Sequence, residues 1–330
     1  MLTQVYNDYD HFTETVSGGD FRMTLCALHQ PVWRLSVLSL EGGAQIQHGC
    51  LGSGNLVEGQ SAAEGTLIYV PLSDLHSYQA INGTEFDSRS CVILRPGTDL
   101  DLSIKGRHEW CSVFVPTRDL PGSGGRAAAL NPQGIVRRCN NGDLRRLENA
   151  VRTVMSAARS SREFESSPAG KHAAKLMQEW AGRIAVHQPD KTTPGPAVPL
   201  GRPRYATRDI ILRCRNAMEE NPRSRMTVRD LVKTSQVSER TLRNAFNSYF
   251  GVSPGRYLQI RLIRDVHQDL MKADPEADSV TRILLRRGVW EFGRFASRYR
   301  QVYGEVPSAT LRRHERKYSW GQSKNSSGGL

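Results

Sequence analysis

The sequence lacks the motifs that many enzymes and metalloproteins carry. It contains no G-x-G-x-x-G fingerprint, no phosphate-binding loop and no G-x-S-x-G nucleophile motif. His48 and His76 stand 28 residues apart, and no H-x-H with a following glutamate occurs that would supply the ligands of a metal-dependent barrel enzyme. We therefore find no case for a catalytic residue, a cofactor or a bound metal ion.

Cysteine pairs, long apolar runs and targeting signals are also missing. The six cysteines form no C-x-x-C and no zinc-finger spacing, so we expect free, partly buried thiols in a reducing compartment. A redox-sensing thiol remains an alternative. No stretch approaches the ~18–20 apolar residues that span a bilayer, and the N-terminus lacks the basic and apolar regions of a signal peptide. We expect a cytoplasmic protein without membrane contact. The cysteines are Cys26, Cys50, Cys91, Cys111, Cys139 and Cys214.

Positive charge is present in excess, and it is concentrated in one part of the chain. The 330 residues carry a formal net charge of +12. Residues 201–320 hold 25 Lys and Arg against 13 Asp and Glu, which accounts for the whole excess. Basic residues that neutralise phosphates release counterions, so a polyanion is the partner that this distribution favours. A solvated basic surface is the alternative.

The N-terminal half reads as short strands followed by helices. Residues 21–117 contain apolar runs at 32–40, 65–70, 90–94 and 110–115, each bounded by glycine or proline, and this spacing predicts a small barrel or sandwich. Residues 143–186 switch to a helical period. These amphipathic helices are expected to pack on the barrel, and a dimer contact is the alternative.

Proline marks the boundary between two predicted domains. Five prolines and two glycines between 189 and 203 predict a semi-extended linker. We expect a barrel-like effector or dimerisation domain at 1–186, a linker at 187–204, a DNA-binding domain at 205–315 and a disordered tail at 316–330. The expected fold class is α+β, with a β-barrel or cupin-like N-terminal domain and an all-α C-terminal domain.

The C-terminal domain contains the same pattern twice. A first set of apolar and helix-stop positions recurs at a constant offset of 53 residues, which indicates one supersecondary unit used twice. Basic residues lie between the apolar positions, so the pattern predicts a double helix-turn-helix that binds DNA. The first set is Leu242, Phe246, Phe250, Gly251 and Pro254, and the second is Phe295, Tyr299, Tyr303, Gly304 and Pro307.

The outer faces of two helices supply the candidate DNA contacts. In the first unit Ser238 is expected to cap a reading helix that buries Leu242 and Phe246. The second unit has one extra residue in its turn and a reading helix that starts near Trp290, so the two units should read different sequences. Arg and Asn suit guanine and adenine edges. The candidates are Glu239, Arg240, Arg243, Asn244 and Asn247 in the first unit, and Glu291, Gly293, Arg294, Ser297 and Arg300 in the second.

A long helix is expected between the two units. Residues 255–272 span about 27 Å at ~1.5 Å per residue, which suits reading helices in successive major grooves about 34 Å apart. Its expected apolar side consists of Tyr257, Leu258, Leu262, Val266 and Leu270. Arg256, Arg261 and Arg264 are expected to be able to reach phosphates.

Residues 205–313 resemble the DNA-binding domain of the AraC/XylS family of transcriptional regulators. The resemblance rests on Leu231, Val237-Ser238, Arg240, Leu242, Phe246, Gly251-Val252-Ser253-Pro254, Tyr257-Leu258 and the second half from Ser279 to Pro307. The stretch from Gly288 to Phe295 is similar to one branch, which includes the regulator of ethanolamine utilisation. The resemblance implies seven helices, two reading heads, promoter activation through RNA polymerase and an N-terminal effector or dimerisation domain. Residues 284–287 are bulky where many members have small residues.

Three hypotheses follow from these patterns. The first is a DNA-binding regulator that activates a catabolic or accessory operon in response to a small molecule of unknown identity. The second is a regulator whose barrel only dimerises or binds a protein partner. The third is an enzyme built on the barrel and tethered to DNA, which needs a polar cluster inside the barrel. Double-stranded DNA is the expected partner, and a homodimer is left open.

Overall fold

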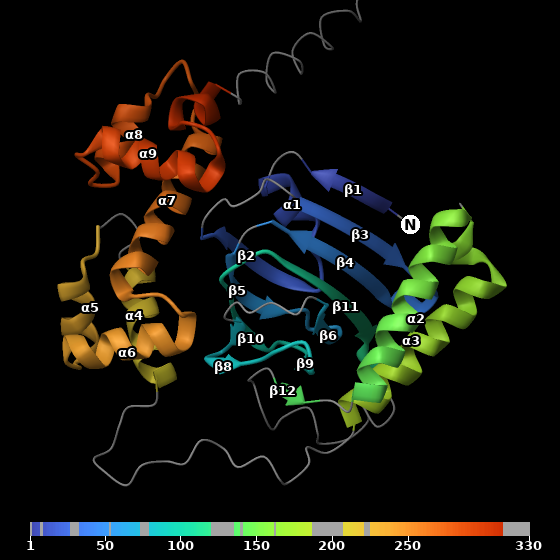
Figure 1. Ribbon diagram of the computed structural model, residues 1–330. Helices are drawn as coiled ribbons and strands as arrows, with labels where there is room; N and C mark the ends of the chain where they lie inside the picture. The colour runs from blue at the N-terminus through green and yellow to red at the C-terminus, as the bar shows by residue number, and fades with distance from the viewer. Residues whose placement is uncertain are drawn as a thin grey trace, which may run out of the picture. The chain divides into compact units, whose positions relative to one another are not determined.

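The computed structural model describes residues 2–6, 9–26, 33–52, 54–72, 79–119, 135–138, 141–161, 163–186, 207–220 and 225–312. The chain divides into two compact units near residue 204. The first is rich in strands and the second is helical, so the predicted α+β class is confirmed (Figure 1). The predicted linker and tail lie outside the described residues, and the domain boundaries stay predictions.

Two sheets form the body of the first unit, and every strand pair whose register is described is antiparallel. The seven-stranded sheet has the order β1 (Leu2–Tyr6), β3 (Trp33–Ser39), β4 (Gln45–Leu51), β11 (His108–Pro116), β6 (Gly65–Pro71), β9 (Ser90–Leu94) and β12 (Ile135–Arg138). The five-stranded sheet has the order β2 (Gly19–Leu25), β5 (Asn55–Ser61), β10 (Asp99–Ile104), β7 (Gln79–Ile81) and β8 (Thr84–Glu85). The predicted strands at 32–40, 65–70, 90–94 and 110–115 correspond to β3, β6, β9 and β11.

Two helices cover the seven-stranded sheet, as predicted for residues 143–186. The apolar stripes of α2 (Asn141–Ser160) and α3 (Pro168–Val186) share one buried core with β4, β6, β9 and β11 (Figure 1). β6 and β9 are buried along their whole length, because one face meets the interior and the other meets these helices. A strand buried on both faces carries a continuous apolar run, which is the pattern that these segments show.

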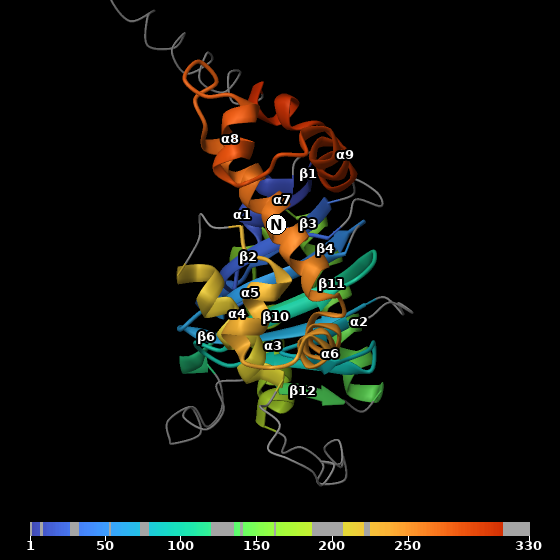
Figure 2. The same cartoon turned by 90° about the vertical axis from the view of Figure 1, so that its left-hand side faces the viewer.

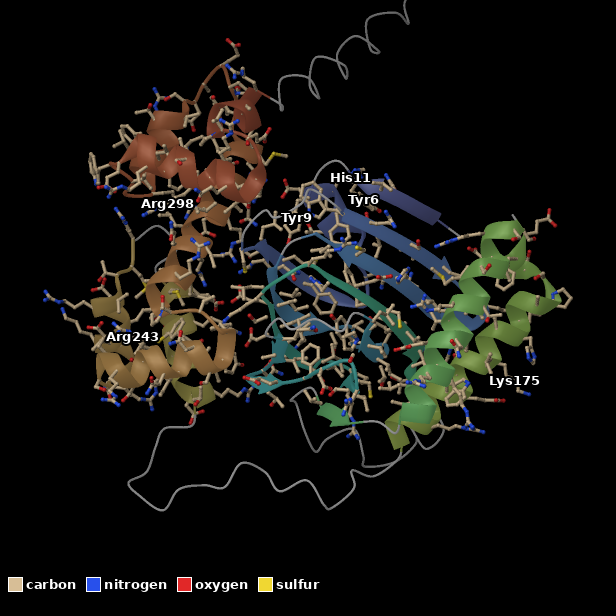
Figure 3. The ribbon with its side chains drawn as sticks, viewed as in Figure 1. Tyr6, Tyr9, His11, Lys175, Arg243 and Arg298 are labelled. Atoms are coloured by element: carbon tan, nitrogen blue, oxygen red, sulfur yellow. The ribbon has the colours of Figure 1, made fainter. Side chains whose placement is uncertain are left out.

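Short elements complete this unit. They are α1 (Tyr9–Thr15), η1 (Glu41–Gly43), η2 (Thr117–Asp119) and η4 (Phe164–Ser166). Aromatic rings pack where α1 meets β1 and β3: Tyr6 meets Phe12 edge-on at 5.6 Å between ring centroids, and Tyr9 lies 5.9 Å from Trp33. Figure 3 labels Tyr6, Tyr9 and His11 at this end of the sheet.

Two described thiols are too deeply buried to be reactive. Burial is the main cause that raises the pKa of Cys111 to about 12 and that of Cys214 to about 11. For Cys111, raising the pKa from 9.0 to about 12 lowers the thiolate fraction near neutral pH by about a thousandfold. This burial favours the expectation of inert, structural thiols.

We predict that neither thiol of the folded chain reacts with a disulfide reagent at about pH 8. Both should be labelled once guanidinium unfolds the chain, because the thiolate fraction then returns to its ordinary value. Mass spectrometry of the labelled peptides identifies each site. Rapid labelling of Cys111 in the folded chain would contradict the burial argument.

Helices build the described part of the second unit. They are α4 (Thr207–Glu220), α5 (Val228–Ser235), α6 (Glu239–Phe250), α7 (Pro254–Lys272), α8 (Val280–Arg286) and α9 (Phe292–Tyr303). Residues 307–312 are helical as well, in line with the seven helices that the resemblance implies. We call α5 with α6 the first head and α8 with α9 the second head. α6 lies at one end of α7, and α9 lies at the other (Figures 1 and 2).

Candidate nucleic-acid interface

Local sequence signals set the boundaries of the first head. Thr227 begins α5 with a capping box, in which its hydroxyl accepts the Asp230 amide and the Asp230 carboxylate accepts the Thr227 amide at 2.9 Å. The hydroxyl and amide of Thr227 also hold the pKa of Asp230 below its usual value. Gln236 ends α5 in the left-handed conformation, with φ 57. Ser238 then caps α6 by accepting the Thr241 amide at 3.1 Å, as predicted.

The inner face of α6 fixes its orientation. Leu242 and Phe246 are fully buried, and the Phe246 and Phe250 rings lie 5.3 and 4.7 Å from the ring of Tyr257 on α7. This packing turns the opposite face outward. All five predicted contact residues on α6 are exposed, namely Glu239, Arg240, Arg243, Asn244 and Asn247. Their contact with DNA stays a prediction.

The second head presents α9 in the same way. Phe295 and Tyr299 are buried, which is the orientation that the repeat predicts. Glu291, at the N-cap position, and four residues of α9 are exposed, again as predicted, and the four are Gly293, Arg294, Ser297 and Arg300. Their role in binding DNA also stays a prediction.

Each reading helix begins with a glutamate paired to an arginine. The Arg243 guanidinium donates to the Glu239 carboxylate at 2.9 Å, and Arg294 donates to Glu291 at 3.1 Å. All four side chains are more than 60% exposed. Exposed pairs of this kind contribute at most about 1 kcal/mol to stability, so each arginine can turn to another acceptor at small cost.

Arg298 is an exposed cation that the repeat did not reveal. At the offset of 53 residues its counterpart is Ala245, which is buried in the first head. Arg298 instead follows Arg294 by four residues, so both lie on one side of α9. The spacing of four residues from Arg294 would have predicted that Arg298 lies on the same face. Figure 3 labels Arg298 on the second head and Arg243 on the first.

The helix between the heads is confirmed, and its buried face matches the predicted one in part. α7 has 19 residues, which is about 28 Å at ~1.5 Å per residue. Its buried side includes Ile260 and Ile263, whereas Leu258 and Leu262 are half-buried. Tyr257, Val266 and Leu270 are buried as predicted. Leu258 and Leu262 were misassigned because apolar residues occupy adjacent positions.

The expectation that Arg264 can reach phosphates is wrong. Its side chain is buried, and its guanidinium donates to the Asp265 carboxylate at 2.7 and 3.0 Å. Arg256 is exposed and Arg261 is half-buried, so these two keep access to solvent. The candidate phosphate contacts on α7 are therefore Arg256 and Arg261.

The bulky segment at 284–287 packs without crowding the second head. Leu284 is buried, whereas Leu285 is 38% exposed. Arg286 pairs with Asp278 at 2.5 Å and, as the main cause, holds the pKa of that carboxyl below its usual value. Arg287 reaches α7 and makes two bonds to the Asp269 carboxylate, at 2.6 and 2.8 Å. Leu284 thus packs in the core, Leu285 is partly exposed, Arg286 pairs with Asp278 and Arg287 joins α8 to α7.

A buried polar chain crosses the second head. The fully buried Tyr299 hydroxyl lies 2.5 Å from Nδ1 of His267 on α7 and 2.8 Å from the Thr310 hydroxyl. Thr310 donates in turn to the Glu305 carboxylate at 2.6 Å. The sequence predicts the buried ring of Tyr299, but not these partners, because they come from separate segments.

We predict that Tyr299→Phe lowers the free energy of unfolding by about 1–3 kcal/mol, since buried partners lose their hydrogen bond. Denaturant unfolding of the chain measures the effect. Thr310→Val should cost less when Tyr299 is already phenylalanine, because the two share one network. Additive costs would mean that the hydroxyls are not coupled.

The first unit contains a hollow between its strands that is mostly apolar. Its cavity volume is about 60 Å³, smaller than the ~300–1,000 Å³ of typical small-molecule sites, so a guest of that size would need the lining side chains to move. Its walls include Phe21, Val57, Ile81, Leu100, Leu102 and Trp110. The described residues that line it include no Lys, Arg, Asp or Glu. Such a wall suits an uncharged guest.

Two buried polar atoms on this wall have no partner among the described residues. They are the hydroxyl of Tyr69 and Oδ1 of Asn55. Burial raises the pKa of Tyr69, so its phenol stays protonated and can donate. A buried polar group without a hydrogen bond lowers stability by about 1–3 kcal/mol. Binding of a ligand or a water molecule that forms hydrogen bonds with these two atoms would therefore be favoured.

Metal-binding and catalytic clusters do not emerge from the part of the chain that the structure describes. Within it, no group of three or more His, Cys, Asp or Glu side chains could hold a metal ion. His48 lies 2.7 Å from the Glu109 carboxylate as an isolated pair, and His76 lies outside the described residues. His108 is the imidazole in the wall of the hollow, which offers no carboxylate for acid–base work. The interior therefore gives the enzyme hypothesis little support.

The second unit matches a known family. The model of the family described as "Helix-turn-helix domain" covers residues 231–313. The probable thc operon regulatory protein of Rhodococcus erythropolis is 34% identical over 113 residues, 34% of either chain. The XylDLEGF operon transcriptional activator 1 of Pseudomonas putida is 34% identical over 103 residues, 31% of this chain and 30% of that protein. The chain thus spans about a third of the length of these relatives.

Residues 231–313 are therefore a helix-turn-helix domain, and a third of the chain is similar to regulators of operons. Membership of the whole chain in the AraC/XylS family stays a prediction. The similarity to the ethanolamine branch stays a prediction.

Solved structures give weaker matches. The AraC-like transcriptional activator CuxR covers 76% of this chain and 87% of its own at 13% identity and a TM-score of 0.38. ToxT from Vibrio cholerae covers 94% and 96% at 13% identity and a TM-score of 0.31. Separately, within the described residues no helix is both long and apolar enough to cross a membrane.

Proposed function

We propose that this chain is a sequence-specific DNA-binding regulator of transcription. The observation that carries the proposal is the pair of heads at the two ends of α7, each with an exposed arginine-bearing helix. Reading helices that enter successive major grooves must be about one helical turn of DNA apart, and α7 supplies a spacer of about 28 Å. The concentration of basic residues in this part of the chain supports the same partner.

Activation of an operon is the favoured mode. Two relatives of this domain are named as regulators of operons, and one of them is named as an activator. RNA polymerase is the partner that activation requires. A homodimer would double the site, although one chain with two heads can bind DNA by itself. A cytoplasmic location follows if the chromosome is the target.

Binding of the full-length chain to duplexes selected from a random pool tests the proposal. We expect a preferred sequence and an affinity that falls steeply with salt, because each phosphate contact releases counterions. Alanine at Arg240, Arg243, Arg294 and Arg298 together is the control, since all four are exposed and their loss leaves the core intact. A chain that selects no sequence, or that binds as tightly with all four arginines removed, would refute the proposal.

We further propose that the hollow in the first unit binds the effector, and that the effector is neutral and largely apolar with one hydrogen-bonding group. The absence of charge among the described lining residues and the unpartnered atoms of Tyr69 and Asn55 support this chemistry. A thermal-shift screen should find neutral compounds that stabilise the chain and lose their effect in Tyr69→Phe. If no compound does so, the barrel serves only for dimerisation or a protein partner.

A further inference from the structure

Trp290 is the extra residue in the turn of the second head. Gln236 and Gly288 both take the left-handed conformation, with φ 57 and φ 66, so the two turns begin alike. Val237 then corresponds to Val289 at an offset of 52 residues. The N-cap residues of the reading helices, Ser238 and Glu291, differ by 53. The one residue without a counterpart is Trp290, directly before the cap of α9.

This inserted tryptophan is exposed together with a neighbouring phenylalanine. Trp290 is 72% exposed and Phe292 is 38% exposed, on either side of Glu291. The first head has Ser238 and Glu239 at the start of its reading helix and no large apolar side chain there. Isolated exposed apolar residues are common, but here two exposed aromatic residues lie within three positions at the start of one helix.

A glycine lies next to these rings without a reason inside the chain. Gly293 is in the first turn of α9, and a Cβ added there would meet no atom within 4 Å. Its φ is not in the left-handed region that requires glycine. Glycine in a helix costs about 0.5–1 kcal/mol relative to alanine. At the offset of 53 residues its counterpart in the first head is Arg240, so the bare backbone is a property of the second head alone.

Positive charge surrounds this apolar tip. Arg294 follows Gly293 directly, and Arg298 lies one turn further along α9. Arg294 is paired with Glu291, whereas no ion pair of Arg298 is found among the described residues. This surface combines two aromatic rings, a helix backbone without a side chain at Gly293, and flanking arginines. It is complementary to a polyanion that also carries apolar groups. The major groove of DNA does so through the thymine methyl groups.

We propose that the second head reads its half-site mainly through apolar contact. Trp290 and Phe292 pack on thymine methyl groups, and the missing side chain at Gly293 lets the first turn of α9 approach the bases closely. Arg294 and Arg298 hold the neighbouring phosphates. The first head reads by hydrogen bonds from Arg and Asn, so the two halves of the operator differ in the chemistry by which they are recognised. This inference rests on the proposed DNA-binding function.

Binding to the duplex that the full-length chain selects tests this inference. Trp290→Ala and Gly293→Ala should each weaken binding at least tenfold. Gly293→Ala should keep or raise the melting temperature, because alanine favours the helix and meets no atom. Val306→Ala is the matched control: Val306 is also exposed, at 37%, but it follows the far end of α9, which does not point at bases. It should bind like the parent.

Deleting thymine methyl groups tests the contact itself. Uracil in place of thymine within the second half-site should weaken the parent chain severalfold and leave Trp290→Ala unaffected, since the contact is then already lost. The inference is wrong if Trp290→Ala and Gly293→Ala bind like the parent, or if no thymine methyl matters. Failure of the parent chain to select any duplex would instead refute the proposed function.

Discussion

Leu242→Ala is expected to unfold the first head and to leave the second head folded. Leu242 is fully buried on the inner face of α6, and large-to-small changes in a core cost about 2–5 kcal/mol. The corresponding change in the second head is Phe295→Ala, at a residue that is 6% exposed. A footprint on the selected operator should shrink to the half-site of the intact head in each variant.

Thr234→Ala is the control for this result, because Thr234 lies on α5 with its side chain exposed. It should retain the full footprint and the parent stability. Loss of both half-sites in Leu242→Ala would mean that the two heads fold as a single cooperative unit. Loss of neither would mean that Leu242 does not hold α6 in place.

Arg243→Ala is expected to weaken specific binding by about 1–3 kcal/mol, or roughly 10- to 150-fold, and to relax the preference at one base pair. The Arg243 side chain is 61% exposed on the outer face of α6, and its guanidinium is paired with Glu239. It can therefore turn to a guanine, which accepts two bonds from an arginine. Binding to a panel of operators changed at single positions measures both effects.

Arg261→Ala is the matched control for Arg243→Ala. A phosphate contact from α7 should weaken all operators alike and should reduce the slope of log affinity against log salt by about one. An Arg243→Ala chain with unchanged sequence preference would contradict the base contact and would place Arg243 with Arg261 among the phosphate contacts.

The double helix-turn-helix could be predicted from the sequence because its signals are local. Ser238 caps α6, and Gly251 and Gly304 end α6 and α9 in the left-handed conformation. Each of these signals acts within one turn of the chain. The inner faces followed from apolar spacing, and the outer faces followed from the inner ones.

What the sequence missed depends on contacts between distant segments. The strands β4, β5 and β10 carry many polar residues, and only their neighbours in the sheets define them. Arg264 was expected to reach phosphates together with Arg261, but it is buried and donates to Asp265. The partners of Tyr299 come from α7 and from the segment after α9, which no periodicity connects.

The sequence showed that the turn of the second head is one residue longer than that of the first. It did not show which residue is the extra one. Only the backbone conformations of Gln236 and Gly288 show where the two turns correspond, and they leave Trp290 as the insertion. Arg298 was missed for the opposite reason, because the repeat places it opposite the buried Ala245.

The glutamates that pair with Arg243 and Arg294 have a consequence for the search along a chromosome. On random sequence each carboxylate stays beside its arginine, lowers the local positive potential and weakens the hold on phosphates. The chain then leaves wrong positions sooner than its number of arginines suggests. At a matching sequence Arg243 exchanges Glu239 for a base edge, so the residence time should increase only there.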